Sequence, residues 1–111
     1  MEKLYGHKIF GPVLFAELTG TCLLMLACNL AGDENLLVPL AYFALVTCFY
    51  EVSGGHFNPA VSIGVWISEK RYVHNLLFLI SISLFQFLGA LLALCIGYIM
   101  RVTVTDPETG G

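Results

Sequence analysis

A helix-start signal lies between two strongly apolar stretches of this chain, and it limits the folds that the chain can adopt. Asn58 and Pro59 follow a pair of glycines. Asn is a preferred N-cap residue, and Pro is favoured in the first turn because its missing N–H would lack an intrahelical partner there. The apolar sequence after Pro59 ends at Glu69, so we predict a helix over about 58–68. Such a helix is about 15 Å long, which is half the thickness of a bilayer core.

The composition is that of a membrane protein. Of the 111 residues, 58% are hydrophobic and 12% are charged, whereas about a quarter of the residues of a soluble domain are charged. The net charge of −3 and the lack of a basic run argue against a nucleic-acid partner. The four cysteines lie in apolar segments without metal-ligand spacing, so we expect buried free thiols, no metal and no cofactor.

Three apolar segments are candidates for membrane-spanning helices, which need about 20 apolar residues each. They cover about 9–31, 36–52 and 76–100. The second is short, and its Pro39 is tolerated if it lies in the first turn of the helix. Residues 1–8 form a polar lead, and 101–111 are expected to be a loop or C-terminal tail. The predicted fold is therefore an all-α membrane protein with three transmembrane helices and one re-entrant half-helix.

Lysines and arginines are distributed unevenly along the chain. Two precede the first span, two lie in the linker before the third span at Lys70 and Arg71, and one, Arg101, follows the third span. The turn after the first span carries none. By the positive-inside rule, the N-terminus and the linker lie on the cytoplasmic side, or on the matrix or stromal side of an organelle, and the C-terminus lies opposite.

Three motifs resemble those of the aquaporin and aquaglyceroporin channels, the major intrinsic protein family. The run Ser53-Gly54-Gly55-His56-Phe57-Asn58-Pro59-Ala60-Val61-Ser62 resembles the extended NPA box, SG(A/G)HxNPAV(T/S). Residues 16–21, AELTGT, resemble the AEFxGT box of the first helix, and residues 86–90, QFLGA, resemble the Q-x-x-G-A box of the third. The resemblance covers about residues 10–100. It covers only one of the family's two halves, because this sequence holds no second NPA box.

The resemblance implies passive transport of water or small neutral solutes, not an enzyme activity. In the family, backbone carbonyls before the Asn form a ladder for the permeating molecule, and the Asn donates its amide toward the channel. The positive end of the half-helix dipole opposes cations and protons. The residues expected to line the pore are Gly54, Gly55, His56, Phe57, Asn58, Pro59, Ala60 and Val38.

Two polar residues in the predicted spans are expected to support the pore loop. Glu17 places a carboxylate inside an apolar helix, where a charge is costly and is usually partnered or functional. The resemblance implies that Glu17 accepts hydrogen bonds that brace the loop, and a proton relay is the alternative. Gln86 is expected to support the same loop. The spacing of Gly89, Ala93 and Gly97 predicts close approach between helices.

Val38 is the residue from which we predict the selectivity between water and glycerol. It lies 20 residues before Asn58, at a position where water-selective family members usually carry an aromatic side chain. Valine is smaller, so the resemblance implies a filter wide enough for glycerol as well as water.

The partners follow from the missing half. We expect the chain to lie in a lipid bilayer and to be completed by a second aquaporin-like half, from the same longer chain or from a separate subunit. The alternative is a non-conducting structural subunit of a larger membrane complex, derived from an aquaporin. The two differ in whether a partner presents a second Asn-Pro-Ala half-helix to Asn58.

Overall fold

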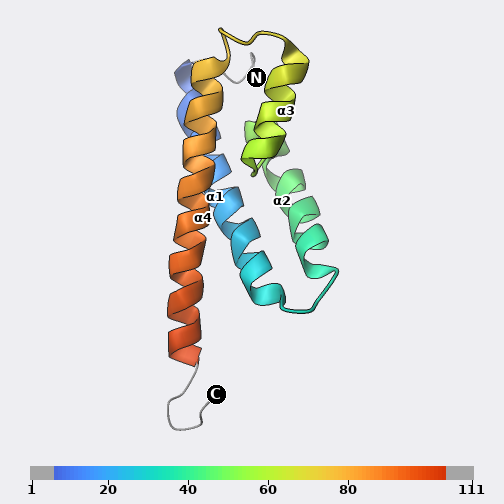
Figure 1. Cartoon of the computed structure of the whole chain (residues 1–111), viewed down its shortest axis with the longest axis vertical. Helices are drawn as coiled ribbons and strands as arrows, with labels where there is room; N and C mark the ends of the chain where they lie inside the picture. Colours follow the sequence, from blue (N-terminus) through green and yellow to red (C-terminus); the bar gives the residue numbers. More distant parts are fainter. Residues whose placement is uncertain (1–6, 105–111) are drawn as a thin grey trace.

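The computed structural model describes residues 7–104, and all regular secondary structure within them is α-helical. The four helices are α1 (His7–Ala31), α2 (Leu37–Ser53), α3 (Pro59–Glu69) and α4 (Leu76–Val104). Figure 1 shows α1 and α4 crossing side by side, with α2 diverging from α1. The start of α1 and the α3–α4 connection lie at one end of the molecule. The α1–α2 turn and the end of α4 lie at the other.

Two of the described helices are long and apolar enough to cross a membrane. They are the 22 residues Phe10–Ala31 of α1 and the 28 residues Leu76–Thr103 of α4. At about 1.5 Å per residue these are about 33 and 42 Å long, against a hydrocarbon core of about 30 Å. The apolar helix α2 has 17 residues, or about 25 Å, and is shorter than that core.

The ends of α2 follow from its sequence. Pro39 is the third residue of the helix, where its missing N–H removes no intrahelical bond. At the other end, Gly54 adopts a left-handed conformation with φ 86°, and its N–H donates to the Tyr50 carbonyl. This is the geometry for which a glycine after a helix is favoured, because a Cβ would be strained there.

Helix α4 is longer than the sequence predicted. Residues Arg101–Val104 were expected in the tail but continue the helix. They contain neither Gly nor Pro, and the Thr103 hydroxyl donates to the Ile99 carbonyl at 3.0 Å. Arg101 lies in the last turn, where a cation complements the helix dipole.

The core lies where α1 packs against α4. Its buried members are Val13, Leu14, Phe78 and Ile82, with Phe10 and Phe85 packed against them. Further along, Gly89 allows the two backbones to approach closely, because a Cβ there would overlap the Leu18 carbonyl oxygen. Helix α1 also packs against α2, and α3 packs against α4.

The other face of α4 is apolar and exposed. Leu77, Leu84, Leu91 and Tyr98 recur every seven residues and are 57–71% exposed, so they form one stripe along the helix. An exposed apolar stripe of this length is the surface expected against lipid or a membrane partner.

Candidate functional site

The loop of residues 54–58 joins α2 to α3 where the facing ends of the two helices meet, partway along the molecule (Figure 1). Its backbone is unusual. Gly54, Gly55 and Phe57 all have positive φ, at 86°, 67° and 54°. Glycine adopts this conformation freely, but a phenylalanine there costs about 1–3 kcal/mol and persists only when its surroundings hold it.

Packing around Phe57 supplies that hold. The side chain is 1% exposed and lies against Gly20 of α1, where any Cβ would overlap the ring. Two aromatic rings of α2 meet it edge-on. Phe49 lies at a centroid distance of 5.8 Å and Tyr42 at 6.4 Å. The aromatic contacts and the glycine therefore fix the strained residue at the base of the loop.

Glu17 connects the loop to both long helices. It is fully buried in α1, and its carboxylate accepts three hydrogen bonds. Oε1 accepts from the His56 N–H at 3.1 Å, and Oε2 accepts from the Phe57 N–H at 2.7 Å and from Gln86 Nε2 of α4 at 2.9 Å. Three donors offset much of the cost of burying the charge.

These bonds also set the direction of the loop's carbonyl groups. In a trans peptide the N–H and the C=O of the same unit point in opposite directions. Because the Phe57 N–H points to Glu17, the His56 C=O points away from it. The His56 N–H likewise turns the Gly55 C=O away. Two consecutive carbonyls therefore lie on the side of the loop opposite Glu17.

A second polar contact joins the loop to α3 and α4 through Ser62, which the sequence analysis did not single out. Its buried hydroxyl lies 2.9 Å from His56 Nδ1 and accepts from Gln86 Nε2 at 3.0 Å. Ser62 lies one turn after Asn58, and its polarity within an apolar half-helix was the available signal.

Asn58 is the N-cap of α3. Its backbone is extended, with φ −155°, and its Oδ1 accepts from the Ala60 N–H at 2.9 Å. Pro59 occupies the first helical position. The side chain of Asn58 is exposed, so its Nδ2 donors are accessible to a ligand once Oδ1 is engaged in the cap.

One predicted site residue lies apart from the others. Val38 is in the first turn of α2, 15 residues before Ser53 at the end of that helix, which corresponds to about 22 Å along the axis. The remaining predicted pore residues, 54–60, are contiguous. The structure brings them together with Glu17 and Gln86, whereas Val38 lies in the first turn of α2, at the opposite end of that helix from Gly54.

Tyr42 is a further residue at the loop that the sequence analysis missed. Its hydroxyl donates to the His56 carbonyl oxygen at 3.2 Å. Nothing in its local sequence distinguishes it from other aromatic residues of an apolar helix, because the contact depends on how α2 lies against the loop.

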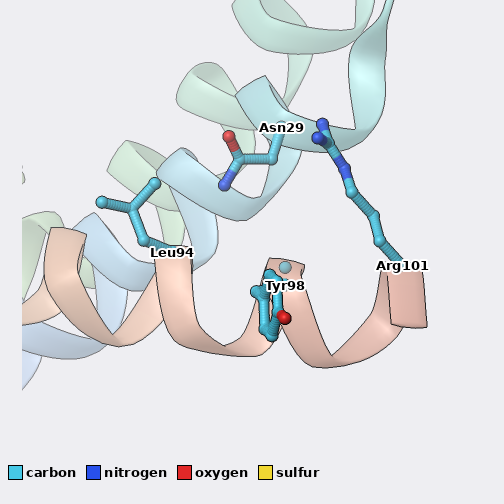
Figure 2. A pocket seen from close by; sticks show the side chains of 5 residues that line it. Asn29, Leu94, Tyr98 and Arg101 are labelled. Atoms are coloured by element: carbon cyan, nitrogen blue, oxygen red, sulfur yellow. The ribbon is translucent and has the colours of Figure 1, made fainter. Parts of the chain in front are cut away.

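A pocket of about 260 Å³ lies elsewhere, near the ends of α1 and α4. Its lining residues are Asn29, Leu94, Gly97, Tyr98 and Arg101. Figure 2 shows Asn29 reaching from α1 toward α4, and Arg101 reaching from α4 toward α1. These α4 residues follow Gln86 by 8 to 15 positions, or about 12–22 Å, so the pocket is separate from the loop.

Comparison with known proteins finds similarities to a single protein family. The family model for the major intrinsic proteins matches residues 13–110. The chain is 36% identical over 68 residues to an aquaglyceroporin of Toxoplasma gondii, covering 61% of the chain and 25% of that protein. It is 30% identical to mouse aquaporin-4 over 119 aligned residues, covering 94% and 35%. It is 38% identical to aquaporin PIP2-7 of Arabidopsis thaliana over 60 residues, covering 54% and 18%.

The chain therefore spans at most about a third of the length of these relatives. No solved structure gives a significant match to it.

Proposed function

The chain belongs to the major intrinsic protein family, and we propose that it forms one half of a membrane channel that passes water and small neutral solutes. Aquaporins of this family are integral membrane channels and not enzymes. Because the chain spans at most about a third of the relatives compared, the proposed pore requires a second half. That half comes from a longer form of the chain or from a separate subunit.

One observation carries this proposal: the buried carboxylate of Glu17 binds the N–H groups of His56 and Phe57. It satisfies the donors of an irregular loop and turns the carbonyls of Gly55 and His56 to the opposite side. At membrane depth, irregular backbone is tolerated where protein covers it or where it lines a water-filled cavity. In the proposed channel, protein covers the N–H side of the loop through Glu17, and the carbonyl side of the loop lines the water-filled path.

The permeating molecule would move along that carbonyl side and past Asn58. The carbonyls accept hydrogen bonds, and the Asn58 amide donates them. The N-terminus of α3 adds a partial positive charge of about half a unit, which disfavours cations and protons. These groups together favour a small, neutral molecule that both donates and accepts hydrogen bonds.

The proposed membrane arrangement has α1, α2 and α4 as spans and α3 as a re-entrant half-helix. With 11 residues, α3 is about 16 Å long and connects the middle of the molecule to the end where α1 begins (Figure 1). The distribution of Lys and Arg supports an orientation with that end on the cytoplasmic, matrix or stromal side.

Photo-cross-linking from the half-helix tests whether a second half completes the pore. A photoreactive residue replaces Ala60, which is exposed in the first turn of α3, in the chain expressed in its own membrane. We expect cross-links to a second Asn-Pro-Ala half-helix, and the intact mass of the native polypeptide tells whether it lies on the same chain. A photoreactive residue at Leu84, on the exposed stripe of α4, is the control. Cross-links from position 60 to lipid alone would contradict the proposal.

A further inference from the structure

Tyr42 touches the loop in two ways that the pore proposal does not use. Its hydroxyl donates to the His56 carbonyl oxygen at 3.2 Å. Its ring packs edge-on against Phe57, with an interplanar angle of 82°. The side chain is only half-buried, so one part of it faces the loop while another part remains accessible.

The direction of the His56 carbonyl places the Tyr42 hydroxyl relative to the proposed pathway. That carbonyl points away from Glu17, because the N–H of the same peptide unit points toward it. A group that donates to the His56 oxygen must approach from the carbonyl side. The hydroxyl of Tyr42 therefore lies on the side along which the permeating molecule would move.

We propose that Tyr42 is a specificity-determining residue. Beside the pore loop, it lowers the permeability to glycerol and other polyols relative to the permeability to water. The inference rests on the proposed channel function. The hydroxyl occupies one of the two lone-pair sites of the His56 oxygen, and the ring fills space next to it. Water can use the remaining site. Glycerol has three hydroxyl groups and needs several partners at once, so losing one acceptor disfavours it more than water.

This restriction lies at a different level of the pathway from Val38. Val38 lies four residues before Tyr42, about 6 Å farther toward the start of α2, and predicts a wide opening there. Tyr42 narrows the path at the loop itself. We therefore expect glycerol to pass more slowly than the small side chain of Val38 alone would allow.

The ratio of glycerol to water permeability tests the inference. The native assembly is isolated through a tag on the full chain and reconstituted into vesicles as wild type, Tyr42→Phe and Tyr42→Val. The Phe variant keeps the ring and frees the His56 carbonyl. We expect its ratio to rise about two- to tenfold, the factor for one hydrogen bond. The Val variant also removes the ring, and its ratio should rise further.

Tyr50→Phe is the matched control. It removes the same hydroxyl from the same helix at a side chain that is 63% exposed, and its ratio should equal that of the wild type. Because the ratio compares two solutes in one preparation, a variant that merely lowers the amount of folded channel does not change it.

Infrared spectra of protein labelled with ¹³C at the histidine carbonyls provide a readout that does not depend on flux. The contact with Tyr42 is made by the His56 carbonyl, so Tyr42→Phe should move one labelled band to higher frequency, and Tyr50→Phe should not. An unmoved band would overturn the hydrogen bond on which the inference rests.

The flux outcomes separate the two proposals. Flux with an unchanged ratio in both Tyr42 variants would overturn the role of Tyr42 and leave the channel proposal standing. Absence of flux in every chain, with the second half present, would overturn the channel proposal and the role of Tyr42 together.

Discussion

At the scale of single residues, the loop depends on one carboxylate. Glu17 is buried, and a buried charge is favourable only when enough donors surround it. It has three donors, from two peptide units of the loop and from Gln86. Removing the carboxylate would leave all three donors without this acceptor in a buried place, and each unsatisfied donor carries its own cost.

Glu17→Gln tests this dependence with little change in volume. The amide keeps one acceptor oxygen but replaces the other with an NH₂ group, which cannot accept from the N–H groups now bound there. We expect the free energy of unfolding to fall by about 1–3 kcal/mol, seen as a lower melting temperature in a fixed detergent.

Glu51→Gln is the control, because Glu51 also lies in an apolar helix but is exposed, and its melting temperature should not change. A Glu17→Gln protein that melts like the wild type would refute the bracing role.

Sequence alone indicates Glu17 more readily than Tyr42 or Ser62, for a physical reason. A carboxylate in an apolar helix signals that partners must exist, whatever they are. A tyrosine or serine in such a helix gives no such signal, because a single hydroxyl is far less costly to bury than a charge. Their roles follow from the angle at which α2 and α3 meet the loop, which local sequence does not determine.

At the scale of helices, glycines decide how closely α1 and α4 approach. A Cβ on Gly89 would overlap the backbone carbonyl oxygen of Leu18, whereas a Cβ on Gly97 would meet the Asn29 side-chain amide at 3.2 Å. Backbone cannot move without shifting a helix, but the end of a side chain can. The small-residue spacing in the sequence predicts close packing, but it does not show which glycine faces backbone.

Gly89→Ala and Gly97→Ala therefore form a graded pair within one helix. Alanine is the better helix former at both positions by about 1 kcal/mol. We expect Gly89→Ala to destabilise the protein by about 1–3 kcal/mol through overpacking, and Gly97→Ala to have a small effect. Thermal unfolding of the two variants under identical conditions makes the comparison. Equal melting temperatures would contradict the packing described for α1 and α4.

Helix ends show where sequence signals are strong and where they are weak. Asn58 and Pro59 indicate the start of α3 because a capping side chain and a missing donor both suit a first turn. The end of α4 has no such signal. The polar residue Arg101 suggested a tail, but a cation in the last turn is compatible with a helix, and α4 continues to Val104.

At the scale of the whole molecule, the proposed arrangement fixes which segments share a side of the membrane. The start of α1 and the α3–α4 connection lie at the same end (Figure 1). That arrangement was predictable in outline from segment lengths and charge distribution. How the loop packs against the proposed second half could not be predicted, because that packing depends on surfaces outside these helices.

Epitope accessibility tests this topology. One tag is inserted at Lys70-Arg71 in the linker, one at the N-terminus and one after Asp106. In sealed vesicles of known orientation, we expect the first two to be protected or exposed together and the third to behave oppositely, because three spans put the termini on opposite sides. Finding both termini in the same compartment would exclude the three-span arrangement.

Stopped-flow light scattering on vesicles that contain the native assembly tests the central claim most directly. With the second half present, we predict water flux well above that of protein-free vesicles, measurable glycerol flux, and no flux of K⁺, because the carbonyl groups of the loop and the N-terminus of α3 favour neutral molecules. Water flux no faster than that of protein-free vesicles, with both halves demonstrably assembled, would contradict the claim that this chain is half of a channel.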